Sequence, residues 1–192
     1  MPHASSPSPA RLTAVLFSLR GCLVHVDDDG AHPTPGALAC LAHLAERSLP
    51  CLWLDAGASA EHSRLAAVLP QGLPRQVGAS RPWPAPDACW QALMALGCEH
   101  LHGGVVVSAE PTLLQSALNA GLWTVGLAAC TPPCAHSARQ WQGLSESAQV
   151  KARGEATLAL YALGVHSVID HLEALPLCLT DIAQRLAKGE KP

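Results

Sequence analysis

The sequence predicts an α/β protein with a mostly parallel sheet, and three observations support this prediction. Short apolar runs alternate with longer segments of helical periodicity along the 192 residues. The apolar runs are nearly continuous, which is typical of strands buried on both faces of a sheet. Gly121 and Gly164 each separate a helical segment from an apolar run, as glycines that end helices do. Together these features indicate parallel strands covered by helices on both sides.

The expected elements follow this alternation in order, and the strand at 13–19 is expected to be central. The strands are predicted at 13–19, 50–56, 104–109, 122–128 and 166–170, with 75–79 as a candidate for a short additional strand. The helices between them are predicted at 35–48, 59–69, 85–97, 111–120, 146–163 and 171–188. A chain of this length holds one full core and is short for two. We therefore expect a flexible N-terminal tail at 1–11 and a single domain over 12–192.

Composition excludes several classes of protein. The formal net charge is −3 and the basic residues are scattered, so no nucleic-acid partner is expected. No apolar run reaches the roughly 18 residues of a membrane span, and no membrane association is expected. The first eleven residues lack the apolar core of a signal peptide, which predicts a cytoplasmic protein. In that reducing compartment the eight cysteines are expected to be free thiols.

The stretch AVLFSLRGCLV, at 14–24, reads as a buried strand that leads into a loop. In parallel α/β sheets, ligand sites lie at the carboxyl ends of the strands. The loop offers Ser18, Arg20 and Cys22 at this place, where metal-dependent chemistry would need carboxylates.

Several further segments resemble one known family. They are LNAGLWTVGLA (118–128), GVHSVIDHLEALPLCLTDIAQRLAKGEKP (164–192), SRPWPAP (80–86), FSLRGCLV (17–24) and PGALACLAHLAERSLPCLWL (35–54). The chain is similar in these segments to the phosphonoacetaldehyde hydrolases (phosphonatases) of the haloacid dehalogenase-like (HAD) superfamily. The resemblance covers most of 12–192 and implies a three-layer αβα, Rossmann-like HAD core.

The resemblance also implies where a catalytic site would lie. Members of the superfamily attack phosphorus with an aspartate at the end of the first strand. They hold Mg²⁺ with that residue and an aspartate after the fourth strand, and a basic residue steadies the phosphoryl group. The positions that match in this sequence are Ser18 for the nucleophile, Arg20 for the second loop position, Ser108 and Ala109 for the paired aspartates, and Arg81 for the basic residue, with the loop glycine kept as Gly21.

Phosphonatases further carry a helical cap with a lysine that forms a Schiff base with the substrate, and neither is expected here. Only about ten residues, 25–34, separate the first loop from the next predicted helix, and Lys151, Lys188 and Lys191 all lie far downstream. A serine hydroxyl is a poor Mg²⁺ ligand, and Arg20 puts a fixed cation near the former metal position. Ser18 would need a neighbouring base to act as a nucleophile. We therefore expect no catalytic residue, no Mg²⁺ cofactor and no cap domain.

The same positions predict a binding site for an anion. The hydroxyls of Ser18 and Ser108, the guanidinium groups of Arg20 and Arg81, and the backbone at Gly21 are expected to gather at one end of the sheet. No carboxylate is expected there, so the pocket would be positive and suited to an oxyanion such as phosphate or a phosphonate. The alternative is that Arg20 pairs with Asp55 or with the acidic run Asp27–Asp29.

Three other groups of residues are weaker candidates for chemistry. Cys130, Cys134 and His136 are potential zinc ligands but lack a fourth partner, so no metal site is expected. Asp55, Glu110 and Asp27–Asp29 are potential replacement carboxylates, although helix capping is the expected role of Asp55 and Glu110, and a solvated turn that of the acidic run. A further set concerns aromatic residues: Trp53 and Trp123 are expected in the core, and Trp83, Trp90 and Trp141 are candidates for an exposed patch that could serve as a partner surface.

Two functional hypotheses follow. The first is a non-catalytic relative of the phosphonatases that has a binding or regulatory role, with an oxyanion ligand or a protein partner, and homo-oligomers are compatible with it. The second is a hydrolase of the same class with rebuilt active-site chemistry.

Overall fold

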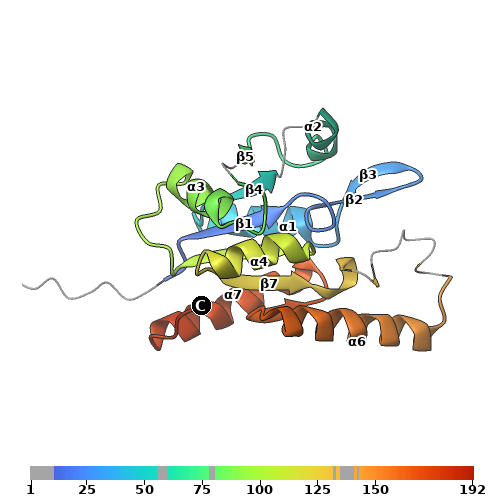
Figure 1. Ribbon diagram of the computed structural model, residues 1–192. Coiled ribbons are helices and arrows are strands. Elements are labelled where there is room, and N and C mark those ends of the chain that lie inside the picture. Colours follow the sequence, from blue (N-terminus) through green and yellow to red (C-terminus); the bar gives the residue numbers. More distant parts are fainter. Residues whose placement is uncertain (1–10, 56–59, 78–80, 132, 135–140, 142) are drawn as a thin grey trace, which may run out of the picture.

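A computed structural model describes residues 11–55, 60–77, 81–131, 133–134, 141 and 143–192 (Figure 1). Its centre is a six-stranded sheet in which every pairing between neighbours is parallel. The order across the sheet is β5 (Arg75–Val77), β4 (Cys51–Asp55), β1 (Ala14–Ser18), β6 (Gly104–Ser108), β7 (Trp123–Leu127) and β8 (Ser167–Ile169). The predicted fold class is confirmed, and the first strand lies inside the sheet between β4 and β6. The predicted tail lies outside the described residues except for Arg11, and the division into a tail and one domain stays a prediction.

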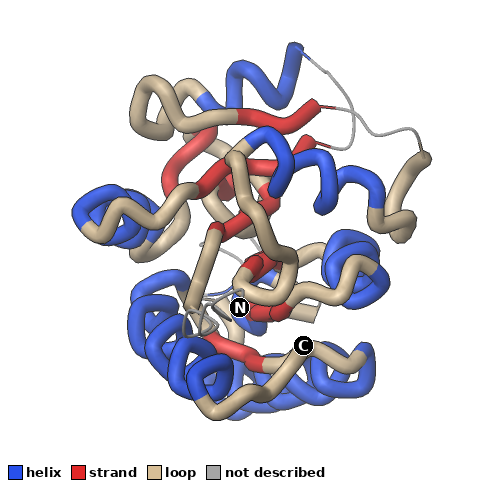
Figure 2. Tube along the Cα trace, turned by 90° about the vertical axis from the view of Figure 1, so that its left-hand side faces the viewer, coloured by secondary structure: helices blue, strands red, loops and turns tan. Residues whose placement is uncertain are grey.

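Helices cover both faces of this sheet, as Figure 2 shows. They are α1 (Ala37–Glu46), α2 (Ala60–Ala66), α3 (Asp87–Ala95), α4 (Pro111–Asn119), α6 (Glu146–Leu163) and α7 (Leu175–Ala187), with short 3₁₀ turns η1 (Ala128–Cys130) and η2 (Leu172–Ala174). Leu41, Leu65 and Ile182 place α1, α2 and α7 on the face that holds Phe17 of β1. Residues of α3 and α4 pack on the other face, around Leu16. The alternation of Leu16 and Phe17 between two buried clusters is the two-sided burial that the apolar runs predicted.

The ends of the elements agree with the predictions to within a few residues. One predicted helix differs in that its first turn is a 3₁₀ turn. Helix α6 begins after Ser145, whose Oγ accepts a hydrogen bond from the Ala148 N–H, and ends at Gly164 in the left-handed conformation. The predicted helix at 171–188 starts as the 3₁₀ turn η2 and becomes α-helical only at Leu175. None of the described helices is both long and apolar enough to cross a membrane.

The segment between β1 and α1 is an antiparallel hairpin, and the acidic run that was expected as a solvated turn lies at its tip, where Asp28 and Asp29 are exposed. Strands β2 (Val24–Asp27) and β3 (Gly30–Pro33) pair in register, so that His25 lies opposite His32. The sequence signal was present, because apolar and polar residues alternate from Val24 and a two-residue Asp-Asp turn precedes Gly30. Residues 19–36 are all described and hold this hairpin and no helix. That the protein works without a cap stays a prediction.

Candidate functional site

The last residues of β1 and β6 bring two hydroxyl groups together inside the sheet. The Ser108 hydroxyl donates a hydrogen bond to Ser18 Oγ across 2.9 Å, and Ser108 Oγ accepts one from the Glu110 N–H at 2.8 Å. The exposed fraction is 2% for Ser18 and 0% for Ser108. The expected meeting of these two residues is therefore present, but their hydroxyls are buried and bonded to each other rather than facing solvent.

The loop after β1 folds tightly against the loops that follow β6 and β7. The Gly21 N–H donates to the Val24 carbonyl at 2.8 Å, and Gly21 has a φ of +72°, which favours glycine. A Cβ at this position would lie 3.5 Å from the Cβ of Ala109 and 3.7 Å from the Cys130 carbonyl oxygen. The loop therefore leaves little space above the buried Ser18–Ser108 pair.

Buried polar groups of this region are satisfied within the protein. The Thr34 hydroxyl donates to the Cys22 carbonyl, and Thr131 Oγ1 lies within hydrogen-bonding distance of the carbonyl oxygens of Ala109 and Leu127, at 3.0 and 2.8 Å. The Cys22 thiol donates to the Val107 carbonyl at 3.4 Å. Burial raises the pKa of Cys22, so this thiol is neutral and unsuited to act as a nucleophile.

Arg20 has a carboxylate partner that the sequence did not predict. Its Nη1 lies 3.5 Å from Glu61 Oε1, which is in the first turn of α2, and both side chains are more than half exposed. The alternative expectation, a pair between Arg20 and Asp27–Asp29 or Asp55, is wrong for the acidic run. Asp27 instead lies 3.6 Å from His25 Nε2 and 3.4 Å from His32 Nε2. The Asp55 side chain lies outside the described part of the chain.

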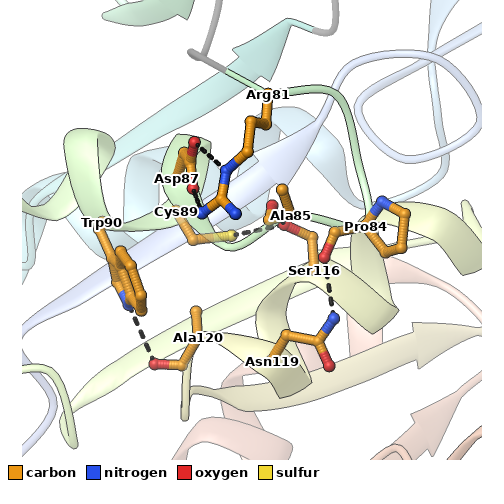
Figure 3. A network of polar contacts seen from close by, with 9 residues as sticks. All are labelled: Arg81, Pro84, Ala85, Asp87, Cys89, Trp90, Ser116, Asn119 and Ala120. Carbon is orange, nitrogen blue, oxygen red and sulfur yellow. Dashed lines mark hydrogen bonds and ion pairs between the residues drawn. The ribbon is translucent and has the colours of Figure 1, made fainter.

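Arg81 is also bound to a carboxylate, in a two-pronged contact drawn in Figure 3. Its Nε and Nη2 donate to the two Asp87 oxygens at 3.0 and 2.6 Å, and these hydrogen bonds lower the pKa of Asp87. Asp87 is in the first turn of α3, where the helix dipole favours a negative charge. The contact holds the Arg81 guanidinium against the start of α3.

The loop between Arg81 and α3 is tied to α4 by two further hydrogen bonds, and a third joins α3 itself to the end of α4 (Figure 3). Ser116 Oγ donates to the Ala85 carbonyl at 2.6 Å, and Asn119 Nδ2 to the Pro84 carbonyl at 2.9 Å. Trp90 Nε1 donates to the Ala120 carbonyl at 3.2 Å. These contacts fix the loop on the face of the sheet that carries α3 and α4.

The expectation that no carboxylate lies near the two arginines is therefore wrong. Glu61 and Asp87 neutralise Arg20 and Arg81, and among the described residues neither arginine makes a hydrogen bond to Ser18 or Ser108. Acidic residues are common in the first turn of a helix, so the sequence could have predicted acidic side chains at the starts of α2 and α3. Which arginine each would meet depended on the order of the strands. Anion binding itself stays a prediction.

The remaining candidates have other partners or lie outside the description. Glu110 stands at the N-cap position of α4 but makes no side-chain cap bond, and the Thr112 hydroxyl donates to it at 3.1 Å. The expected capping role is thus wrong for Glu110, whose carboxylate accepts from the Thr112 hydroxyl and not from a backbone N–H of the helix. Cys134 is buried, burial raises the pKa of Cys130 to about 11, and His136 lies outside the described residues. Within the described ranges, no three potential ligands are placed to hold a metal ion.

The cysteines and tryptophans follow the sequence expectations in part. All eight cysteines belong to the described chain and are free thiols. Trp53 and Trp123 are in the core, as expected. The expected patch of three tryptophans is wrong, because only Trp90 is exposed, while Trp83 and Trp141 pack at the edges of two buried clusters.

Comparison with known proteins finds curated proteins that are similar to part of the chain. No family model matches the chain. It is 35% identical over 109 residues to phosphonoacetaldehyde hydrolase of Klebsiella pneumoniae subsp. pneumoniae, and 36% identical over 109 residues to the enzyme of the same name from Salmonella typhi. Each match covers 57% of this chain and 40% of the relative. The chain thus spans less than half the length of the curated relatives it matches.

Solved structures extend the comparison to most of the chain. One crystal structure is 49% identical with a TM-score of 0.85, and the match covers 94% of this chain and 100% of that one. A phosphonoacetaldehyde hydrolase-like protein from Oleispira antarctica is 28% identical with a TM-score of 0.74, over 82% of this chain and 59% of that one. A hydrolase from Pseudomonas syringae, 14% identical with a TM-score of 0.63 over 89% of this chain and 99% of that one, shares the fold.

Proposed function

The chain belongs to the haloacid dehalogenase-like superfamily and resembles phosphonoacetaldehyde hydrolase, and from this premise we propose that it is a non-catalytic member with a binding or regulatory role. The observation that carries the proposal is the buried hydrogen bond between Ser18 and Ser108. These residues occupy the positions at which the resemblance implies the nucleophile and a metal-binding carboxylate.

The donor groups at these strand ends do not fit Mg²⁺. The ion takes near-octahedral oxygen ligands, among them carboxylates, and keeps several waters. Ser18 and Ser108 offer two neutral hydroxyls, which are bonded to each other and to the Glu110 N–H. Their burial leaves little room for waters, since the exposed fractions are 2% and 0%. The positions of Ser18 and Ser108 therefore supply no carboxylate ligand to Mg²⁺.

The geometry gives less support to a hydrolase with rebuilt carboxylates. Asp27 lies between two histidines on the hairpin, and Glu110 accepts a hydrogen bond from Thr112. Asp27 has no hydroxyl or thiol among its described partners, and the hydroxyl beside Glu110, that of Thr112, is exposed on the first turn of α4. A general base must lie within hydrogen-bonding reach of the group that it activates.

The ligand that we propose is an oxyanion such as phosphate or a phosphonate, held by Arg20 and Arg81. Both guanidinium groups are more than half exposed, so an anion has access to them. Exposed ion pairs contribute between about 0 and 1 kcal/mol, and a phosphate dianion that binds a guanidinium through two hydrogen bonds competes well with one carboxylate. The Arg20–Glu61 contact, at 3.5 Å, is the weaker of the two existing pairs and the one that an anion would displace first.

The non-catalytic role is tested by an assay for phosphate release from phosphonoacetaldehyde and from an aryl phosphate, with Mg²⁺ present. We expect no turnover above the background without protein. Turnover above about 1 s⁻¹, in the range of ordinary enzymes, that EDTA removes and Ser18→Ala abolishes would overturn the proposal.

The ligand is tested by titrating inorganic phosphate calorimetrically into the wild type and into an Arg20→Ala, Arg81→Ala double variant. Binding heat is expected from the wild type and not from the double variant. Arg47→Ala is the matched control, because Arg47 is an exposed arginine directly after the last residue of α1. Equal heats from the wild type and the double variant would show that phosphate does not bind through Arg20 and Arg81, and no heat from either would show that it does not bind; both results would overturn the proposed site.

A further inference from the structure

The hairpin of β2 and β3 carries two histidines and an aspartate on one of its faces. Successive side chains of a strand alternate between faces, and His25 and Asp27 are two residues apart on β2. His32 of β3 lies directly opposite His25 in the register, so it shares their face. Val24 and Ala31 belong to the other face, which packs on the main core. His25, Asp27 and His32, which we call the hairpin cluster, therefore lie on the face away from that core.

Two imidazole rings and one carboxylate converge within the hairpin cluster. His25 Nε2 lies 3.6 Å from Asp27 Oδ2, and His32 Nε2 lies 3.4 Å from Asp27 Oδ1. The centroids of the two rings are 5.5 Å apart, and the ring planes are tilted by 33°. His25 Nδ1 is buried and has no hydrogen-bond partner, so among the described residues the contact with Asp27 is the polar contact that orients this ring. Both rings thus turn the same nitrogen atom toward one carboxylate.

These separations are close to those between the ligand atoms of a four-coordinate transition-metal ion. Imidazole nitrogens and carboxylate oxygens bind Zn²⁺ at about 2.0–2.2 Å, so two ligand atoms at a tetrahedral angle are roughly 3.3 Å apart. The two N···O separations in the hairpin cluster exceed this value by no more than a few tenths of an ångström. Two histidines and one carboxylate are also a recurrent ligand set for divalent transition metals, with water in the remaining position.

The charge of the hairpin cluster favours a cation. The Asp27 side chain is only 20% exposed, and its partners are two histidines, which carry a charge only when protonated. Within the part of the chain that the structure describes, no lysine or arginine forms an ion pair with Asp27. A mostly covered carboxylate is costly unless a cation neutralises it. Asp28 and Asp29, both exposed, add negative charge at the adjoining turn.

In the structure the three groups touch one another, so among the described residues no three ligands surround a free centre. An ion would enter as the side chains turn apart, and the exposed fractions of 38% for His25 and 46% for His32 let them do so. We propose that the hairpin cluster binds a divalent transition-metal ion such as Zn²⁺ or Ni²⁺ through the two imidazoles, with Asp27 as the charged third ligand. This site lies on the hairpin and is distinct from the strand ends at Ser18 and Ser108.

Paramagnetic Ni²⁺ locates the site in the full chain without any substitution. Imidazole is a preferred ligand of this ion, and histidine binds metals in its neutral form, so the titration is done at about pH 7.5. In the ¹H–¹⁵N NMR spectrum, substoichiometric Ni²⁺ should broaden the resonances of residues 24–33 first. Calorimetric titration gives the dissociation constant. Broadening that is confined to other parts of the chain, or no broadening at all, would overturn the proposal.

Substitutions test the three ligands one by one. His25→Gln and His32→Gln should each raise the dissociation constant for Ni²⁺ about a hundredfold or more, because binding through two linked points is lost. Asp27→Asn keeps the shape and removes the charge, and should raise it about tenfold to a hundredfold. His100→Gln is the matched control, since the rings of His100 and His102 also lie 5.5 Å apart but are nearly parallel, at 7°, so their in-plane lone pairs do not converge. Unchanged affinity in the two hairpin histidine variants, or an equal loss in His100→Gln, would overturn the proposal.

Discussion

The Ser108 hydroxyl donates to Ser18 Oγ across 2.9 Å, which joins the ends of two neighbouring parallel strands through their side chains. Ser108 also accepts the Glu110 N–H, so it is the centre of a chain of three polar groups under the β1 loop. The exposed Arg20 and Arg81 each have a carboxylate partner of their own. The proposed role depends on this separation of buried hydroxyls from exposed cations.

Removing the Ser108 hydroxyl should destabilise the protein more than removing that of Ser18. Ser108→Ala leaves both the Glu110 N–H and Ser18 Oγ without this partner, at a cost of about 1–3 kcal/mol in the free energy of unfolding. Ser18→Ala breaks the hydrogen bond from Ser108 but leaves the Glu110 N–H with its acceptor, so the cost is smaller, about 1 kcal/mol. Urea denaturation of both single variants and of the double variant gives the coupling energy. Additive effects of the two substitutions would show that this hydrogen bond adds nothing to stability.

Restoring a carboxylate at position 18 should not restore Mg²⁺ binding. Ser18→Asp places a charge in a site with an exposed fraction of 2%, beside Ser108 and Ala109, which provide no second carboxylate. We expect the variant to be less stable at pH 7 than the Ser18→Asn control by about 1–3 kcal/mol, since Asn has nearly the same shape and no charge. Thermal unfolding with and without MgCl₂ is the measurement. A melting temperature of Ser18→Asp that rises with Mg²⁺, while that of Ser18→Asn does not, would contradict the expectation.

Glu61→Gln should tighten the proposed binding of phosphate. The substitution removes the carboxylate that competes for Arg20, and an exposed ion pair of this kind accounts for a change of about twofold to fivefold in affinity. Glu46→Gln, at the end of α1, is the control for a general change in net charge. Calorimetric titration of both variants with inorganic phosphate measures the difference. An affinity that changes equally in the two variants would show that Glu61 has no specific role.

Stability should fall in mild acid because of His166. Its Nδ1 accepts a hydrogen bond from the Thr124 N–H at 3.1 Å, and burial, with a smaller effect of Arg185, lowers the pKa of His166 below 6.5. The unfolded chain therefore takes up a proton at a higher pH than the folded one. The free energy of unfolding decreases as the pH falls through about 6.5, down to the folded-state pKa.

The pH effect is measured by urea denaturation at several values between about pH 7.5 and 5.5. His166→Asn keeps an acceptor near the position of Nδ1 and cannot be protonated, so its free energy of unfolding should decline less than that of the wild type. His62→Asn, at a partly exposed histidine of α2, is the control for the loss of a histidine elsewhere in the chain. Equal slopes for the wild type and His166→Asn would exclude His166 as the cause.

The sequence by itself determined the fold class and, to within a few residues, the positions of the main strands and helices. It could do so because burial on both faces of a parallel sheet leaves continuous apolar runs, and because Gly164 marks a helix end in the chain itself. It also indicated that Ser18 and Ser108 would meet, since the carboxyl ends of parallel strands share one edge. These properties depend on neighbours in sequence or on one general rule of packing.

The tertiary structure alone decided the partners of the arginines, the burial of the hydroxyls and the outer face of α6. Arg20 meets Glu61 and Arg81 meets Asp87 because of where α2 and α3 begin relative to the strands, which local sequence does not specify. The apolar residues of α6 read in the sequence only as helix, and the side on which Leu158 is exposed follows from which residues pack on β8 and η1. Side-chain contacts of this kind depend on distances between segments far apart in the chain, and a pattern of neighbouring residues holds no information about those distances.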